Sequence, residues 1–160
     1  MTGVCRIEPL SGEADLVGAM QVDAESFPAP WTRAMYESEL AQPDVCFFVV
    51  ARTDRSAVAG YCAFRLVVDE MHISNVAVRP SCRKQGIGRR LVEEVLRRAS
   101  DRRCHRVLLE VRSVNIAARK LYESLGFSAI GIRRGYYDKP ADDAVVLACD
   151  IQIPEPNPNA

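Results

Sequence analysis

The hydrophobic and polar positions of this chain follow two periods, and the changes of period divide it into elements. Apolar residues at three- and four-residue spacing predict helices, and apolar β-branched or aromatic runs predict strands. In chain order, strands are predicted at residues 4–9, 46–52, 57–67, 71–78, 106–111, 127–137 and 144–151. Helices are predicted at residues 13–26, 33–40, 88–102 and 116–124, with Thr32 and Asn115 as N-caps of the second and fourth and Gly126 ending the last.

This order, β-α-α-β-β-β-α-β-α-β-β, predicts an α/β (α+β) fold with a mixed central sheet flanked by helices. A length of 160 residues and a hydrophobic content of 48% suit one domain with an ordinary core. We place that domain at residues 1–151. The remaining residues, 152–160, contain three prolines and are predicted to be a disordered tail.

Charge and cysteine content narrow the class of protein. Lys+Arg and Asp+Glu both number 21, so no overall field favours nucleic acid or an anionic membrane. The six cysteines include no Cys-x-x-Cys pair and there are only two histidines, so neither a metal site nor a disulfide framework is predicted. No run suggests a signal peptide or a membrane span. We therefore expect a cytoplasmic protein without a metal and without a nucleic-acid or membrane partner, and make no prediction of its oligomeric state.

A short basic loop follows the fourth predicted strand. The apolar run ends at Pro80, and residues 83–88 read Arg-Lys-Gln-Gly-Ile-Gly where the next helix begins. A strand-loop-helix element of this kind points backbone N–H groups and the positive end of a helix dipole at one spot, which suits a phosphate. The spacing lacks the Gly-Lys-Ser/Thr end of a Walker A loop, and Leu91 stands where a dinucleotide fingerprint needs its third glycine. The loop therefore predicts a different phosphate-containing ligand.

Two residues further along the chain are candidates for acid–base chemistry. Glu110 is a lone carboxylate in an apolar strand, on the face opposite its apolar neighbours, and the alternative is a strand-end glutamate that pairs with Arg112 or faces water. Tyr122 lies on the apolar face of its predicted helix, where the alternative is a core aromatic whose hydroxyl finds a buried acceptor. His72, in the strand before the basic loop, is an alternative base, and a structural role for it stays open.

Several motifs then occur in one order along the chain: Asn75-Val-Ala-Val, Arg83-Lys-Gln-Gly-Ile-Gly-Arg89, Leu109-Glu-Val-Arg112, Asn115-x-x-Ala118, Leu121-Tyr122, Gly126-Phe127, Gly131-Ile-Arg-Arg-Gly-Tyr-Tyr137 and Asp142-Asp-Ala144. In this order, from about Phe27 to Ile151, the chain resembles the RimI-type N-terminal acetyltransferases of bacteria, which belong to the GNAT superfamily. The resemblance implies a GNAT-like domain that transfers an acetyl group from acetyl-coenzyme A to the α-amine of a protein N-terminus. The acceptor expected in that family is the N-terminal alanine of a small-subunit ribosomal protein.

The resemblance also implies a role for particular residues. Glu110 matches the family's general base and Tyr122 its general acid. The residues expected to contact acetyl-coenzyme A are Val76, Ala77, Val78, Lys84, Gln85, Gly86, Ile87, Gly88, Arg89 and Asn115. Those expected to enclose the acceptor are Phe27, Trp31, Tyr136 and Tyr137. The fold of the family further implies that the strand splays near Val78, where a backbone N–H would meet the oxyanion.

Two residues depart from the family pattern. Val114 stands where serine is common, so a hydroxyl contact is missing there, and Asp142 replaces a common glutamate with a shorter side chain.

The chemistry of the acceptor favours an N-terminal amine over a lysine. An α-amine has a reference pKa of about 7.7–8.0, whereas that of a lysine side chain is about 10.4, so the base has less work to do at an N-terminus. Two other functions stay open: an acetyltransferase for lysine or a small-molecule amine, and an acyl-coenzyme A-binding module without turnover.

Overall fold

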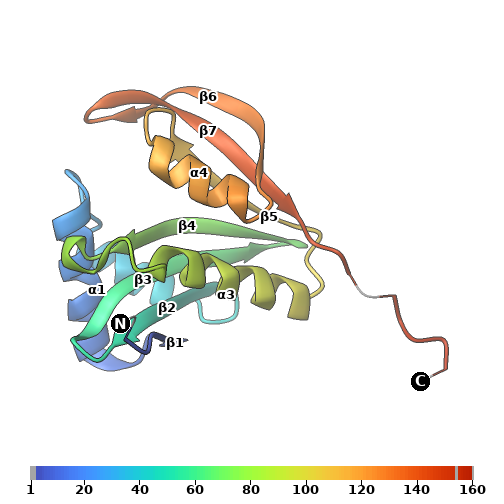
Figure 1. Cartoon of the computed structure of the whole chain (residues 1–160), viewed down its shortest axis with the longest axis horizontal. Coiled ribbons are helices and arrows are strands. Elements are labelled where there is room, and N and C mark those ends of the chain that lie inside the picture. The colour runs from blue at the N-terminus through green and yellow to red at the C-terminus, as the bar shows by residue number, and fades with distance from the viewer. Residues whose placement is uncertain (1–2, 154, 160) are drawn as a thin grey trace.

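A seven-stranded mixed sheet in the order β1-β2-β3-β4-β5-β7-β6 runs through the computed structural model (Figure 1). The structure describes residues 3–153 and 155–159. Its strands are β1 (Arg6–Pro9), β2 (Cys46–Thr53), β3 (Ser56–Val67), β4 (Glu70–Val78), β5 (Arg106–Arg112), β6 (Ser128–Asp138) and β7 (Ala141–Asp150). Its helices are α1 (Gly12–Ser26), α2 (Arg33–Leu40), α3 (Ile87–Asp101) and α4 (Ile116–Ser124), with a 3₁₀ turn, η1 (Pro80–Cys82). The predicted fold class and order of elements are confirmed.

Local sequence explains where the helices begin and end. The Thr32 hydroxyl accepts a hydrogen bond from the Met35 N–H, and the Asn115 side chain accepts one from the Ala118 N–H, so both predicted N-caps are confirmed. Gly126 follows α4 with a φ of 98°, a left-handed conformation that glycine adopts without strain. Helix α3 buries one face, formed by Leu91, Val92, Val95 and Ala99.

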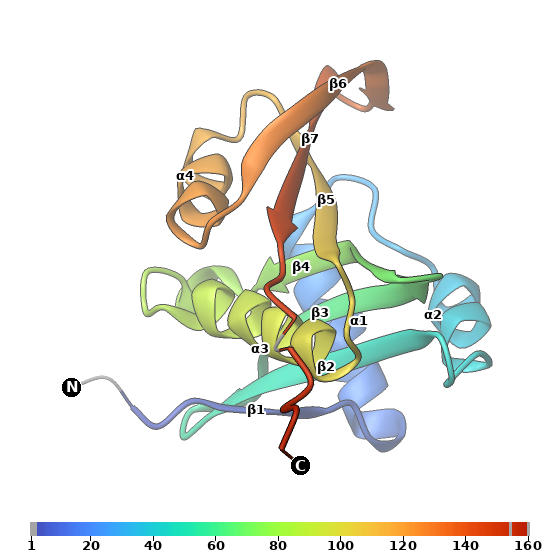
Figure 2. The ribbon, with the colours of Figure 1, turned by 90° about the vertical axis from the view of Figure 1, so that its right-hand side faces the viewer.

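Two hydrophobic clusters cover the sheet unequally. The larger cluster lies under α3 and α4 and takes residues from β2, β3, β4, β5 and β7, including Val107 of β5 and Leu147 of β7. The smaller lies under α1 and α2 and takes strand residues only from β2, β3 and β4, such as Phe48 and Tyr61. Turning the molecule shows α1 and α3 on opposite faces of the first strands (Figure 2). Strands β2–β4 are therefore packed between helices, whereas β5 and β7 are covered on one face and β6 is exposed along nearly its whole length.

The start of the last strand differs from the prediction for a physical reason. Strand β7 begins at Ala141 rather than residue 144, because Tyr137 pairs with Asp142 and Asp138 with Ala141 in the hairpin. The hairpin register thus draws polar residues that read as a loop into the strand. The residues before α3 include the turn η1, where a plain loop was predicted.

The chain end carries no helix or strand at residues 152, 153 and 155–159, and the predicted division into a domain and a disordered tail stays a prediction. Met1, Thr2, Pro154 and Ala160 lie outside the described residues. All six cysteines are free thiols. Among the described helices, none combines the length and the apolar character needed to cross a bilayer.

Candidate active site

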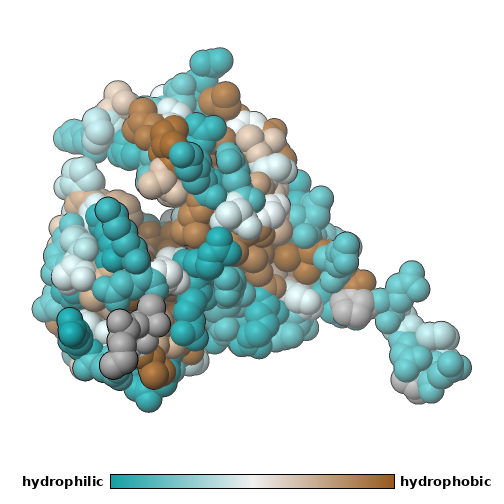
Figure 3. All heavy atoms as spheres, viewed as in Figure 1, coloured by the Kyte–Doolittle hydropathy of each residue, from teal (hydrophilic) through white to brown (hydrophobic). Residues whose placement is uncertain are grey.

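The site begins where neighbouring strands β4 and β5 part. They pair in parallel over Glu70–His72 and Arg106–Leu108, and no further pairing between them occurs in the described chain. Beyond His72, β4 continues to pair with β3, and beyond Leu108, β5 continues to pair with β7. The surface is hollowed on this side of the molecule, with hydrophobic residues along the hollow (Figure 3). An opening at the carboxyl ends of parallel strands is a common place for a ligand.

Strand β4 carries an irregularity next to this opening. Ala63 pairs with Asn75 while the next residue, Phe64, pairs with Ile73, so Ser74 is the extra residue of a bulge. Val78 pairs with Gly60 of β3 but lies beyond the last β4–β5 pair, so β4 is apart from β5 at Val78 as expected, whereas the bulge lies four residues earlier; an oxyanion contact from a backbone N–H near Val78 stays a prediction. A bulge bends the strand and changes which face its side chains occupy, which the sequence period did not predict.

The basic loop after β4 has the backbone of an anion-binding turn. Lys84 and Gly86 have φ values of 62° and 78°, and α3 begins immediately afterwards at Ile87. Gly86 is the N-cap and makes no side-chain cap, so the first N–H groups of α3 are left for another acceptor. An added Cβ at Gly86 meets nothing within 4 Å. This open, positively polarised turn fits a phosphate group.

Gly88 has a different role from Gly86. Its φ is not in the left-handed region, and an added Cβ would lie 3.5 Å from Cδ2 of Leu121 on α4 and 3.8 Å from Cγ2 of Val78. Small size at Gly88 thus leaves space between the first turn of α3, the end of β4 and helix α4. The neighbouring Arg89 spans the same gap, donating from Nη2 to the Ser124 hydroxyl at 2.5 Å. The basic loop and α4 therefore face each other across a narrow space.

Glu110 and Tyr122 lie on the other side of the parting strands. The Glu110 side chain, on β5, is 31% exposed and its Oε1 lies 3.2 Å from Nη1 of Arg133 on β6. The expected alternative partner is wrong: Arg112 donates to the carbonyls of Lys139 and Pro140 and stacks over the Tyr137 ring. Glu110 is thus held by an arginine from a neighbouring hairpin.

Tyr122 is buried in the larger cluster, 6% exposed, with its ring edge-to-face against Phe127. Burial raises the pKa of its hydroxyl, and the neighbouring Cys62 and Tyr137 act in the same direction. That hydroxyl makes no hydrogen bond to the described chain, yet it is not among the polar atoms sealed from solvent. Tyr122 therefore combines the core position expected of an aromatic with a protonated hydroxyl that can still meet a ligand.

His72 lies in the paired part of β4, before the strands part. Its Nε2 is 3.7 Å from Glu70 Oε2, and Glu70 also accepts a hydrogen bond from Arg106. The Arg106 guanidinium, followed by His72, holds the pKa of Glu70 below its usual value. These contacts give His72 a place in a surface ion-pair cluster.

Aromatic residues expected at the acceptor come from two segments on one side of the molecule. Both ribbon views place the tip of the β6–β7 hairpin above the loop between α1 and α2 (Figures 1 and 2). Phe27 is 37% exposed and Tyr136 49% exposed, and the Tyr136 and Tyr137 rings pack edge-to-face at 5.0 Å. In the described chain, no aromatic pair joins the two segments directly. Asn115 is exposed, and its side-chain oxygen is occupied as the α4 cap, which leaves its NH₂ group available to a ligand.

Sequence reasoning missed two residues at this site: Arg133, which contacts Glu110, and Asp23, which accepts a hydrogen bond from the backbone N–H of Trp31. Asp142, noted from the sequence only for its shorter side chain, accepts the Ser113 hydroxyl and the Val114 N–H. Arg133 was visible only as part of a motif, and Asp23 had no signal beyond being a carboxylate on an apolar-spaced helix.

Fold and site together define the class of protein. Residues 16–127 match the model of the acetyltransferase (GNAT) family, and the chain belongs to that family. It is 33% identical over 141 residues to the Escherichia coli (strain K12) [ribosomal protein bS18]-alanine N-acetyltransferase, which covers 87% of this chain and 93% of that protein. It is 36% identical over 147 residues to the Mycobacterium tuberculosis N-alpha-acetyltransferase RimI, covering 88% and 90% of the two chains. The crystal structure of the E. coli ribosomal-protein-S18-alanine N-acetyltransferase superposes with a TM-score of 0.86 at 31% identity, covering 96% of this chain and 98% of that one.

Proposed function

We propose that this protein transfers an acetyl group from acetyl-coenzyme A to the α-amine of a protein N-terminus, with an alanine of a ribosomal small-subunit protein as acceptor. The proposal is supported by the names and the high mutual coverage of the E. coli and M. tuberculosis relatives. A ribosomal acceptor would place the reaction in the cytoplasm. Lysine or a small-molecule amine remains the competing acceptor, and the experiment below separates the two.

One observation carries the proposal: the parting of β4 and β5 has a basic, glycine-containing turn on one side and the Glu110 carboxylate and Tyr122 phenol on the other. The turn at Lys84–Gly86 belongs to the β4 side, whereas Glu110 and Tyr122 belong to β5 and α4. A donor anchored by its diphosphate on the turn could reach along β4 towards Glu110 and Tyr122. The backbone of Val76–Val78 and the Asn115 amide are the groups we propose to guide it.

The residues of the turn fit acetyl-coenzyme A in shape and charge. Its diphosphate is an anion, which the first N–H groups of α3 and the side chains of Lys84 and Arg89 suit. The absence of a side chain at Gly88 leaves room beside the turn for the slender pantetheine arm. Acetyl-coenzyme A would supply an activated acetyl thioester, and the residues of the chain would supply orientation and proton transfer.

We assign proton removal from the attacking amine to Glu110. A base must lie within hydrogen-bond reach of the proton, directly or through one water, and a partly exposed carboxylate at the opening meets that requirement. Arg133 fixes the direction of the carboxylate by bonding one of its two oxygens, leaving the other free to accept. Because an N-terminal amine is partly neutral near pH 7.5, a carboxylate of ordinary basicity suffices.

We assign proton donation to the departing coenzyme A thiolate to Tyr122. Burial raises the pKa of this phenol, so the proton is present at neutral pH. A carboxylic acid in the same place would need a large pKa shift to stay protonated. The amine attacks the acetyl carbon directly, losing one proton to Glu110, and the departing thiolate takes one proton from Tyr122. Because the acetyl group passes straight to the amine, no covalent enzyme intermediate is required.

A panel of peptides tests the acceptor. One peptide begins with a free alanine and lacks lysine, a second is blocked at its N-terminus and contains lysine, and a third is blocked and lacks lysine. We expect acetylation of the first alone, located on the α-amine by mass spectrometry. Acetylation of the second peptide without the first would overturn the proposal in favour of a lysine acetyltransferase.

Two substitutions test the assigned roles. Glu110→Gln and Tyr122→Phe should each lower kcat by about 10²–10⁴-fold, the usual contribution of a general base or acid. Affinity for coenzyme A, measured by calorimetry, should stay within twofold. Glu123→Gln is the matched control, because it makes the same change at the exposed residue beside Tyr122. Unchanged turnover in both variants would remove the acid–base assignment, and the absence of turnover in the wild type would favour a binding module.

A further inference from the structure

A buried carboxylate at the end of α1 has no role in the chemistry described above. Asp23 is fully buried, and no lysine or arginine of the described chain forms an ion pair with it. It lies in the last turn of α1, where the helix dipole disfavours negative charge and no basic residue compensates. A buried carboxylate without a cation is costly unless hydrogen bonds replace its water. Helix formation and burial therefore both disfavour an acid at this position.

Three hydrogen bonds satisfy the Asp23 carboxylate. Its Oδ2 accepts from the Trp31 backbone N–H at 2.7 Å, and its Oδ1 accepts from the Tyr61 hydroxyl at 2.6 Å and from the Asn75 side-chain NH₂ at 3.0 Å. Asn75 also donates to the Tyr61 oxygen at 2.6 Å, so the group forms a closed network. Burial raises the pKa of Tyr61, which keeps its hydroxyl protonated and able to donate.

Each partner of Asp23 leads to a different part of the site. Trp31 ends the loop that we expect to enclose the acceptor. Asn75 follows the bulge at Ser74 and immediately precedes Val76, where the strand is expected to hold the donor. Tyr61 pairs with Ala77 in the β3–β4 ladder. Asp23 thus connects the acceptor loop directly to the donor strand.

The same turn of α1 is tied to the loop after β4 by two more contacts. Glu25 lies 2.7 Å from Nη1 of Arg79, and the Ser26 hydroxyl accepts a longer bond of 3.4 Å from Arg83. Arg83 in turn donates from Nε to the Val78 carbonyl at 3.1 Å. The contacts of Glu25 and Ser26 are exposed and weak singly, whereas those of Asp23 are buried or partly buried. Asp23 is therefore the central member of this connection.

We propose that Asp23 is a positioning residue that fixes the Phe27–Trp31 loop relative to strand β4, so that the acceptor amine is held in line with the donor. The inference rests on the proposed acetyl transfer, since it assigns the loop to the acceptor. It requires only hydrogen bonds and no contact of Asp23 with either substrate. Loosening the loop should disturb acceptor binding and alignment while leaving the donor turn intact, because small errors of alignment cost much in rate.

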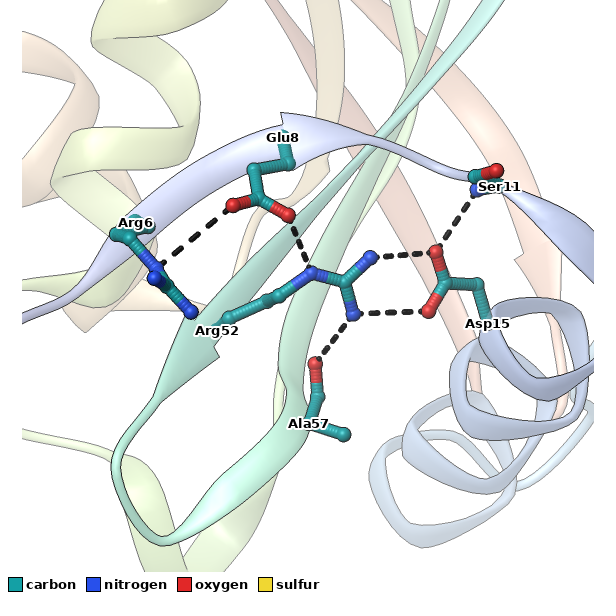
Figure 4. Close-up of polar contacts among 6 residues, drawn as sticks. All are labelled: Arg6, Glu8, Ser11, Asp15, Arg52 and Ala57. Atoms are coloured by element: carbon teal, nitrogen blue, oxygen red, sulfur yellow. Dashed lines mark hydrogen bonds and ion pairs between the residues drawn. The ribbon is translucent and has the colours of Figure 1, made fainter.

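The chain offers a matched control on the same helix. Asp15 is also buried, but its carboxylate binds Arg52 through both oxygens at 2.7 and 2.8 Å and accepts the Ser11 N–H (Figure 4). Arg52 lies on β2 and also contacts Glu8 on β1, so this network anchors the first turn of α1 far from the loop. Asp15→Asn therefore perturbs a buried carboxylate of α1 without touching Trp31 or β4.

The first experiment measures steady-state kinetics with an alanine-initiated peptide. Asp23→Asn is expected to lower kcat/KM for the peptide by tenfold or more, with a raised KM for the peptide and an unchanged KM for acetyl-coenzyme A. Asp15→Asn is expected to leave kcat/KM within twofold even where its urea midpoint falls further. Equal loss of activity in both variants, in proportion to lost stability, would overturn the proposal.

The second experiment needs no activity. Trp31 is the only tryptophan of the chain, so its fluorescence reports the loop directly. Acrylamide quenching of Trp31 should increase severalfold in Asp23→Asn and stay unchanged in Asp15→Asn. Tyr61→Phe, which removes one donor without disturbing the carboxylate, should show the same pattern at reduced size and serves where Asp23→Asn fails to fold. Unchanged quenching in the folded variants would overturn the role of Asp23, whereas a wild type that fails to acetylate the peptide would overturn the proposed function instead.

Discussion

The two parts of the sheet, divided where β4 and β5 separate, differ in how closely they are packed. Strands β1–β4, with α1, α2 and α3, form one half, called the donor half after the proposed donor turn, and its strands β2–β4 carry a hydrophobic cluster on each face. Strands β5, β7 and β6, with α4, form the other half, called the acceptor half because Glu110, the proposed base for the acceptor amine, lies on β5. Its edge strand β6 is exposed along nearly its whole length. Ile130 and Ile132 of β6 are 52% and 60% exposed. The comparison indicates that packing on both faces of the sheet is confined to the donor half, whereas the acceptor half leaves its outer strand free to present side chains.

Removing one buried side chain from the donor half gives the largest expected effect. Leu91 lies on the inner face of α3 and is fully buried, so Leu91→Ala should lower the free energy of unfolding by about 2–5 kcal/mol. Ile132→Ala makes a similar truncation in the acceptor half. Because Ile132 is largely exposed, this substitution should change the free energy of unfolding by less than about 0.5 kcal/mol. Urea denaturation followed by circular dichroism measures both. Equal losses would show that the two halves are packed alike.

A glycine pair sharpens the comparison at the level of ligand binding. Gly88→Val places a branched side chain between α3 and α4 and should weaken coenzyme A binding at least tenfold, or about 1.4 kcal/mol, by calorimetry. Gly131→Val, in β6, enters open space and should leave that affinity unchanged. Affinity that survives the change at Gly88 would contradict the placement of the donor on this turn.

The smallest expected effect concerns acid sensitivity in the acceptor half. The Ser113 hydroxyl, with the Val114 and Asp143 N–H groups, holds the pKa of Asp142 below its usual value. Because the pKa of Asp142 is lower in the folded chain than in the unfolded chain, where it is about 4, this carboxylate stabilises the folded hairpin fully above about pH 4. The contribution is lost as the pH falls through the pKa of the folded chain. Asp142→Asn should therefore reduce the urea midpoint slightly at pH 6, and the difference from the wild type should shrink below pH 4. Asp138→Asn, on the same hairpin, is the control, and a difference that persists at pH 3 would contradict the assignment.

Helices, caps and turns in both halves could be predicted from sequence because their signals are local. The single apolar face of α3 predicts that helix, and Thr32 and Asn115 predict the starts of the helices that they cap. Gly86 follows the same logic, since its φ of 78° is one that glycine adopts readily. Such features depend on residues within one or two turns of one another.

Contacts between distant segments could not be predicted in the same way. Glu110 and Arg133 meet only because β7 lies between β5 and β6, which brings residues from two separate strands to one place. The bulge at Ser74 depends on the register with β3, and alternation in the sequence continues through it. Asp23 finds partners 38 and 52 residues further along the chain. Each requires the topology before the contact can be seen.

The short ladder between β4 and β5 has a consequence for the working cycle. Only three residue pairs hold these neighbours together laterally, and past them each strand presents a bare edge towards the other in the described chain. On the proposed placement, the amides of the donor's pantetheine arm lie along one of those edges and act as an additional, non-protein strand. The bound donor would then fill the gap between β4 and β5 and complete the sheet. After each turnover, coenzyme A would have to leave that edge before the next donor could bind.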